Sequence, residues 1–181
     1  MASAPIEPSA LVILRRTPSL LRALLADVDP EVLHRPNPEG WSIKDVVAHM
    51  HDAEDIAFVA RVRRMLEEET PFIASIDPPA RLREGGYANR TFDELLDDLA
   101  SQRTAHAAWV AALTPEDLAR PGRHDTAGTV TPAAIIHQWA FHDLAHTRQI
   151  MEMLQAGFTP GMANTRTFYP EAEALHRQLT G

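Results

Sequence analysis

The chain has 181 residues, 45% of them hydrophobic, which is enough for one domain with a sizeable core. Its net charge of −8, from 17 Lys and Arg against 25 Asp and Glu, argues against nucleic-acid binding, because phosphate binding needs clustered basic residues. It has no cysteine, which excludes disulfides and thiolate ligands and leaves imidazole and carboxylate as the strong metal ligands.

The N-terminal residues 1–16 carry their positive charges after an apolar run, whereas a secretory signal peptide carries them before it. We therefore expect an irregular start that leads into a helix. No uninterrupted run of about 18 apolar residues occurs, so we expect no membrane-spanning helix and a cytoplasmic location. Neither a membrane nor nucleic acid is an expected partner.

Four segments with helical periodicity are separated by connectors rich in proline and glycine, and strand signals are weak throughout. The first segment covers residues 9–27. Pro18 interrupts it, and Thr17-Pro18 could instead be the N-cap and first turn. The second begins after Ser42, a good N-cap with Asp45 three residues on, and continues to about residue 69.

The third helix begins at Thr91, which can form a capping box with Glu94, and ends near residue 113. The fourth begins at Thr131, with Pro132 in its first turn, and ends near residue 157. Residues 70–90 form a long loop between the second and third helices. A loop of that length in a compact domain is more often functional than accidental.

These elements predict an all-α protein, a four-helix bundle that spans residues 1–157. A C-terminal extension, residues 158–181, is expected to pack on the bundle or to be partly flexible, with a short helix over residues 170–179. Between the first and second bundle helices, Pro30, Pro36, Pro38 and Gly40 make a continuous helix very unfavourable.

Two histidines of the fourth helix lie within an apolar stripe. This stripe is Ile135, Trp139, His142, His146, Ile150 and Met153, spaced by three or four residues and so on one helix face. At i and i+4, the rings of His142 and His146 can converge on one point, a spacing that metal-binding helices use. His49 holds an inward position on the second helix. Its stripe is Val46, His49, Ala53, Ile56 and Ala60.

Three buried imidazoles without partners would cost roughly 1–3 kcal/mol each, and one shared cation would satisfy them together. We therefore predict that His49, His142 and His146 bind one divalent metal ion, with Zn or Ni best suited to neutral imidazole. Three histidines with one open position are typical of catalytic sites. Alternatively, each of the three histidines could be a core residue whose ring is hydrogen-bonded to the protein.

The sequence allows more than one role for several other polar residues near these stripes. Asp52, one turn after His49, could orient a ring or act as general base on a metal-bound water, or could be a solvated carboxylate. Asp143 could cap a neighbouring group or be a solvated carboxylate, and the solvated carboxylate is favoured. His106 could be a fourth ligand, a residue that supports the ligands, or part of the core. Arg103 is expected on a neighbouring face, where a buried cation would favour an anionic ligand.

The remaining histidines are not expected to bind the metal. His51 and His137 fall off the stripes and are expected at surface or boundary positions, and His34, His124 and His176 lie in connectors or in the tail. In the loop between the second and third helices, Arg81 or Arg83 and Tyr87 are expected to shape the mouth of a pocket.

Several motifs together resemble the DinB-like (damage-inducible) superfamily of four-helix-bundle metalloproteins. They are Trp41-Ser42 followed by DVVAHMHDAE, then HDTAGTVT before the last helix and HDLAHTRQI within it, and the resemblance covers about residues 10–156. It implies an up-and-down bundle with a long crossover between the second and third helices. It also implies a site for Zn, Ni or another divalent ion on His49, His142 and His146, and a homodimer.

Proteins of similar fold and metal site include mycothiol-dependent maleylpyruvate isomerase and bacillithiol S-transferases. The resemblance therefore suggests an enzyme in which the metal activates a low-molecular-weight thiol for transfer to a small-molecule substrate. The alternatives are a metal-dependent hydrolase, with Asp52 as base, and a non-catalytic metal-binding stress-response protein.

Overall fold

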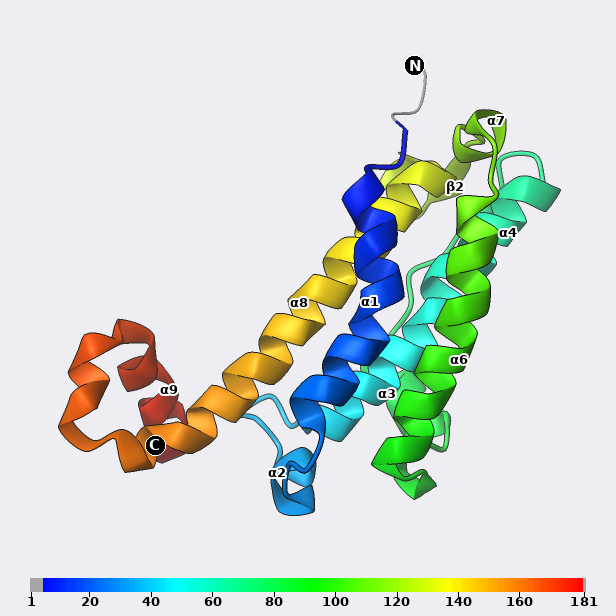
Figure 1. Cartoon of the computed structure of the whole chain (residues 1–181). Coiled ribbons are helices and arrows are strands. Elements are labelled where there is room, and N and C mark those ends of the chain that lie inside the picture. The colour runs from blue at the N-terminus through cyan, green and yellow to red at the C-terminus, as the bar shows by residue number, and fades with distance from the viewer. Residues whose placement is uncertain (1–4, 181) are drawn as a thin grey trace.

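In the computed structural model, which describes residues 5–180, four long helical segments pack side by side (Figure 1). They are α1 (Pro8–Leu25), α3 (Ile43–Ala53) with its continuation α4 (Ala60–Glu67), α6 (Phe92–Ala111) and α8 (Pro132–Phe158). The predicted all-α four-helix bundle is confirmed. The first residues of the expected irregular start, 1–4, and residue 181 lie outside the described part. No helix within that part combines the length and apolar character needed to cross a membrane.

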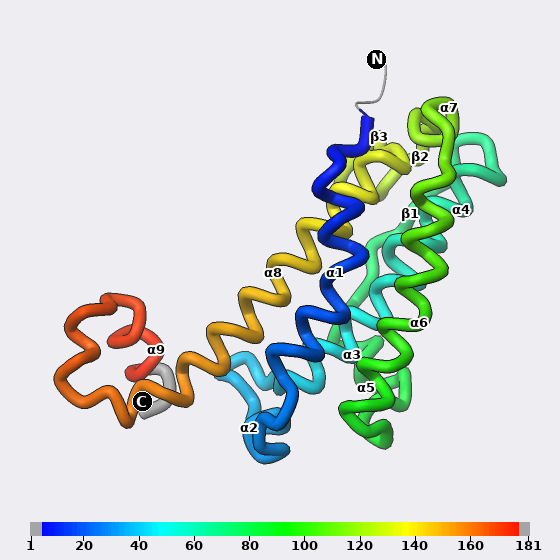
Figure 2. The backbone as a smooth tube through the Cα atoms, viewed as in Figure 1, coloured from blue at the N-terminus to red at the C-terminus, as the bar shows by residue number. Residues whose placement is uncertain are grey.

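The two middle helices of the bundle point the same way. The chain runs down α1, up α3 and α4, up α6 and down α8 (Figure 2). Both α1 and α3 pack against α6 and α8, so α1 lies diagonally opposite α3. The predicted long crossover is confirmed, and it returns the chain to the end of the bundle from which α3 starts.

The connectors contain short elements that hydrophobic periodicity does not reveal. They are α2 (Pro30–His34), β1 (Phe72–Ile73), α5 (Pro78–Glu84), the 3-10 turn η2 (Tyr87–Asn89), α7 (Pro115–Leu118), β2 (Gly122–His124) and β3 (Gly128–Val130). β1 pairs in parallel with β2, which pairs antiparallel with β3. Strands of two or three residues are too short to show an alternating pattern, which explains why the sequence does not predict this sheet.

A C-terminal segment follows α8. It consists of the 3-10 segment η3 (Thr159–Phe168) and α9 (Pro170–Thr180), which contains the short helix predicted over residues 170–179. The segment packs against the end of α8 and lies apart from the four-helix body, in orange and red in Figure 1.

Side-chain caps fix the starts of the long helices as the sequence predicts. The hydroxyl of Ser42 accepts from the backbone N–H of Asp45, while the Asp45 carboxylate accepts from the backbone N–H of Ser42. Thr91 and Glu94 form the same capping box at the start of α6, and Thr131 caps α8. Each cap satisfies backbone N–H groups that would otherwise have no partner.

A π-helical segment, η1 (Glu54–Val59), interrupts the second helix where the sequence predicts a regular one. Its wider turn shifts the buried face of the helix. Ala60, part of the expected stripe, is therefore exposed, whereas Val62 and Met65 are buried. The segment also places the carboxylate of Glu54 inside the bundle. π-helical turns of this kind are frequent at functional sites.

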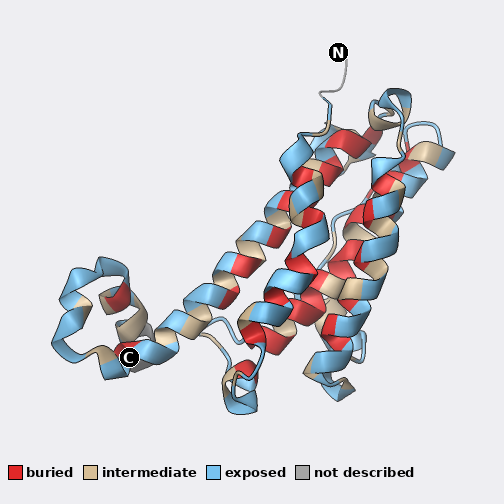
Figure 3. Cartoon of the chain, in the orientation of Figure 1, coloured by how far each residue is buried: buried red, intermediate tan, exposed pale blue. Residues whose placement is uncertain are grey.

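Buried residues lie along the inward faces of the long helices (Figure 3), and the apolar ones form two clusters among the described residues. One cluster includes Leu14 and Trp139, and the other includes Leu21 and Leu99. Buried polar residues separate the two clusters at the middle of the bundle. These residues, which we call the polar layer, are Thr17, His49, Glu54, Arg103, Asp143 and Thr147.

Arg103 of α6 joins the four long segments within the polar layer. Its side chain is 1% exposed and donates to Glu54 Oε2 at 2.8 Å, to Asp143 Oδ2 at 2.5 Å and to the carbonyl oxygen of Leu14 at 2.7 Å. Pro18 lies four residues after Leu14 and has no N–H, so α1 itself provides no helical donor for that carbonyl. The guanidinium supplies the missing donor.

This network decides between the readings that the sequence left open for the first helix and for Asp143. The first helix runs through Pro18 and does not adopt the alternative start at Thr17, because Arg103 satisfies the backbone that proline leaves unpaired. Asp143 is buried, which makes the reading of a solvated carboxylate wrong; its ion pair with Arg103 offsets the cost of desolvation. Arg103 is a buried cation, but the carboxylates of Glu54 and Asp143 more than offset its charge, so it does not by itself favour an anionic ligand.

Replacing Arg103 with methionine should lower the free energy of unfolding by about 3–5 kcal/mol, because Glu54 and Asp143 would remain buried without their partner. Denaturant unfolding measures this change. Arg148→Met is the matched control, since the Arg148 side chain on α8 is 72% exposed and its loss should cost no more than about 0.5 kcal/mol. Equal effects of the two substitutions would show that the network does not hold the bundle together.

Candidate metal centre

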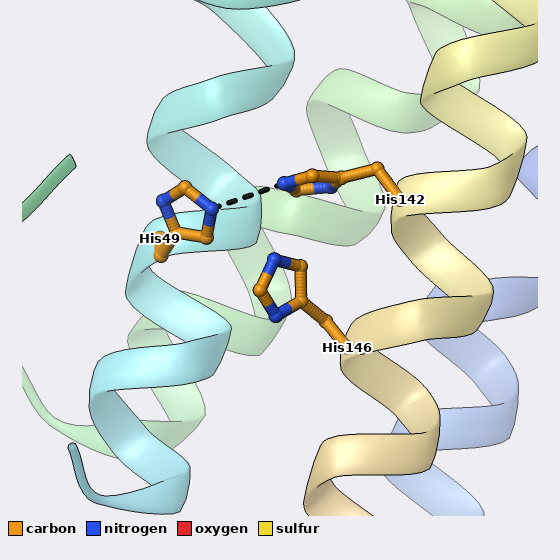
Figure 4. A group of neighbouring side chains, drawn as sticks. All are labelled: His49, His142 and His146. Atoms are coloured by element: carbon orange, nitrogen blue, oxygen red, sulfur yellow. Dashed lines mark hydrogen bonds between the residues drawn. The ribbon is translucent and has the colours of Figure 1, made fainter. Parts of the chain in front are cut away.

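The three histidines predicted as ligands meet between α3 and α8, with their rings turned toward one another (Figure 4). Nε2 of His49 lies 3.0 Å from Nε2 of His142, and one nitrogen from each of the three rings falls within 4.8 Å of the others. The ring centroids of His142 and His146 are 4.3 Å apart. Nitrogens bound to one tetrahedral zinc ion at about 2.0–2.1 Å lie about 3.3 Å from each other, so these rings fit a shared ion.

Burial keeps all three imidazoles neutral. Together with the neighbouring histidines it lowers the pKa of His49 to about 4 and that of His142 to about 2. Burial also lowers the pKa of His146. A metal ligand must be the neutral imidazole, so near pH 7 no imidazolium proton has to be displaced before an ion binds.

Gln149 orients one of the rings. Its Oε1 lies 2.8 Å from Nδ1 of His146, and because an amide oxygen can only accept, the hydrogen of this ring belongs to Nδ1 and the lone pair to Nε2. Such a contact is typical of histidines that bind metals. Nδ1 of His142 is buried and has no hydrogen-bond partner among the residues that the structure describes.

Aromatic side chains pack against the other two rings. The edge of Trp41 meets His49 with ring centroids 5.4 Å apart, and Phe58 meets His142 with centroids 5.1 Å apart. Phe58 is in turn stacked on Trp139 at 5.5 Å. These contacts restrict the rotation of both imidazoles, so the site is preorganised.

Asp52 lies beside the centre, and both of its oxygens are already bonded. Arg81 donates to them through Nε at 3.1 Å and Nη2 at 2.7 Å, and the hydroxyl of Tyr87 donates at 2.7 Å. Burial raises the pKa of Asp52, but these hydrogen bonds outweigh it and hold the pKa below its ordinary value. Asp52 therefore anchors the crossover to α3. Its role as general base stays a prediction that this bonding does not favour.

The centre opens into a cavity of about 520 Å³. All three histidines line it, together with Arg81, as the sequence predicts for the pocket mouth. Of the other two residues expected at the mouth, Tyr87 contacts the site through its hydrogen bond to Asp52, and Arg83 is exposed. The polar lining also includes residues to which the sequence analysis assigned no role: Arg61, His124, Gln138 and Gln149. Of these, Gln149 could have been found from its position three residues after His146.

His106 does not belong to the three-histidine cluster. Its Nδ1 lies 2.9 Å from Oε1 of Glu54, so it borders the polar layer instead. His51 and His137 occupy half-buried boundary positions, as expected, and lie outside the cluster. The stripes of the second and fourth helices thus identified the converging rings, and His106 is not a fourth member of the cluster.

Similar sequences agree on one family. A family model described as the DinB superfamily matches residues 13–150. A Bacillus licheniformis protein named "putative metal-dependent hydrolase" is 30% identical over 146 residues, which cover 75% of this chain and 79% of that protein. A Geobacillus kaustophilus protein of the same name is 28% identical over 148 residues, covering 79% of this chain and 81% of that protein.

Solved structures support the fold. A Bacillus subtilis protein, YfiT, described as "a probable metal-dependent hydrolase with an unusual four-helix bundle topology", matches with a TM-score of 0.73 and 23% identity, covering 81% of this chain and 84% of that one. TT2238, described as a four-helix bundle protein, matches with a TM-score of 0.56 and 23% identity, covering 80% and 96%.

Protein prepared with Zn or Ni should hold about one ion per chain, and His146→Ala should lose it together with the stability that the ion provides. Free metal at a thousand times its Kd stabilises a folded protein by about 4 kcal/mol. Elemental analysis and thermal unfolding with and without a chelator measure both effects. His137→Ala, on the same helix but outside the cluster, should keep the ion. Retention of the ion by His146→Ala with an unchanged Tm would rule out His146 as a ligand.

Proposed function

The chain belongs to the DinB superfamily, and from this membership and the convergence of His49, His142 and His146 we propose that it is a metal-dependent enzyme acting on a small molecule. The fit of three neutral imidazoles around one point carries the proposal. A divalent ion held there, with Zn or Ni best suited, would be a Lewis acid that lowers the pKa of a thiol or water bound to it. Because all three rings line the cavity, a small molecule can reach them.

Transfer of a low-molecular-weight thiol to an electrophile suits this cavity best. A base would assist hydrolysis by taking the proton of the attacking water, but the oxygens of Asp52 are occupied by Arg81 and Tyr87. A free thiol has a pKa of about 8.5, against about 15.7 for free water, so a thiol bound to the ion ionises more readily than bound water. Its proton passes to solvent through the cavity mouth. A carbon–sulfur bond then forms as the leaving group departs with its electron pair.

Metal-dependent hydrolysis is the alternative, and the names of the Bacillus licheniformis and Geobacillus kaustophilus relatives favour it. In that reaction Asp52 would have to release a donor before it could accept a proton from water. The conservative substitution of this residue therefore separates the two reactions.

The homodimer also stays a proposal. Supporting it, α8 exposes a row of apolar side chains on its outward side: Phe141, Leu144, Met151 and Phe158. Phe141 is 74% exposed and Phe158 67%, which is high for aromatic residues. Scattered apolar residues need no explanation, but a row along one helix face is typical of a surface that another chain covers.

The thiol reaction is tested by mixing metal-loaded protein with a generic aryl halide and bacillithiol, mycothiol or glutathione, and with an aryl ester for hydrolysis. We expect thiol conjugation that falls at least a hundredfold in His142→Ala and less than about tenfold in Asp52→Asn. Loss of a general base would instead cost about 10²–10⁴-fold. Ester hydrolysis that depends on Asp52, without conjugation of any thiol, would contradict the transferase and support the hydrolase.

A further inference from the structure

Arg61 brings a guanidinium without a carboxylate partner to the wall of the cavity. It lies in the first turn of α4, and its Nη2 donates to the carbonyl oxygen of Ala74 at 2.8 Å. Among the described residues Arg61 forms no ion pair, whereas Arg81, the other guanidinium of the lining, is paired with Asp52. Burial lowers the pKa of Arg61, which is consistent with a poorly solvated charge. With five N–H donors, Arg61 retains several for a ligand.

His124 lines the same cavity and presents a fixed donor. Its Nδ1 accepts from the backbone N–H groups of Thr126 at 3.2 Å and Ala127 at 3.3 Å. Peptide N–H groups can only donate, so these two contacts favour the neutral tautomer whose hydrogen is on Nε2. Asp125 Oδ1 also lies 2.9 Å from Nδ1, but the Asp125 carboxylate already accepts from the backbone and hydroxyl of Ser75.

The small sheet brings these two donors to one end of the cavity. His124 is aligned with Ile73 in the pairing of β2 with β1, and the next residue, Ala74, accepts the hydrogen bond from Arg61. Arg61 also follows His49 by twelve residues on one helical rod, which corresponds to about 18 Å along the helix axis. The backbone positions of Arg61 and His49 are therefore well separated along the wall of the cavity.

No carboxylate of the lining pairs with the guanidinium, although Asp125, just outside the lining, attracts it and raises its pKa against the effect of burial. The carboxylate of Asp52 is neutralised by Arg81. Glu39, the other carboxylate of the lining, lies two residues before Trp41, which packs on His49 at the opposite end. The cavity thus has a metal-binding end and an end where a guanidinium has no carboxylate within ion-pair distance among the described residues.

We propose that Arg61 and His124 bind an anionic oxygen group of the substrate, such as a carboxylate, and that the substrate is an elongated molecule whose reacting atom lies at the three-histidine end. This inference rests on the proposed function only in placing the reacting atom at the three histidines; the anion-binding subsite does not depend on it. Arg61 supplies charge and paired donors, which suit a carboxylate, and His124 supplies a single directed donor. The subsite selects among substrates by their length and by the charge of the remote end.

The test uses α,ω-dicarboxylates from succinate to sebacate, and monocarboxylates of the same length, titrated calorimetrically into metal-loaded protein. The dicarboxylates place one carboxylate at the metal and the other at the subsite. At the matching length we expect the dicarboxylate to bind about tenfold more tightly than the monocarboxylate, which is the gain expected from one charge-assisted contact. Arg61→Gln should abolish this advantage, and His124→Gln should reduce it.

Arg63→Gln is the matched control, because Arg63 lies two residues further along α4 and stacks on Trp109 at 5.3 Å. It should keep the full advantage, and Arg61→Lys should keep part of it. An equal advantage in wild type and Arg61→Gln would overturn the subsite while leaving the metal centre intact.

If the protein holds no metal, the proposed function fails instead. Monocarboxylate binding that is lost in Arg61→Gln but kept in Arg63→Gln would then still support the subsite, and unchanged binding would overturn it.

Discussion

The guanidinium of Arg103 is the group on which the arrangement of the bundle depends. It comes from α6 and contacts one acceptor on each of the other three long segments: the Leu14 carbonyl, Glu54 and Asp143. Because an unpaired buried charge is costly, sliding any helix by a turn would break a contact that nothing else replaces. Asp143 directly follows His142, so the same network fixes the height at which α8 presents its rings to α3.

The crossover between α4 and α6 completes the cavity that the helices begin. Its α5 is fixed to α3 by the pairing of Arg81 with Asp52, and its β1 aligns β2, which carries His124. The parallel directions of α3 and α6 make this long segment necessary, because the chain must return before α6 can start. The crossover is thus required by the topology of the bundle and also forms one wall of the site.

Local patterns explain what the sequence predicted well. Capping boxes and helical spacing involve residues three or four positions apart, and they located α3, α6 and α8 and the inward rings of His49 and His142. The features that were missed depend on partners far apart in the chain. Asp143 is buried only because Arg103 reaches it from another helix. His124 lay in a recognised motif, but only the pairing of β1 with β2 brings it to the cavity.

The central claim is that imidazoles from α3 and α8 share one ion. X-ray absorption at the metal edge of zinc-loaded protein tests it most directly, because the spectrum counts and identifies the atoms bound to the metal. We predict three histidine nitrogens at about 2.0–2.1 Å and an additional ligand from solvent. A spectrum with oxygen ligands alone, or with fewer than three imidazoles, would contradict the shared centre.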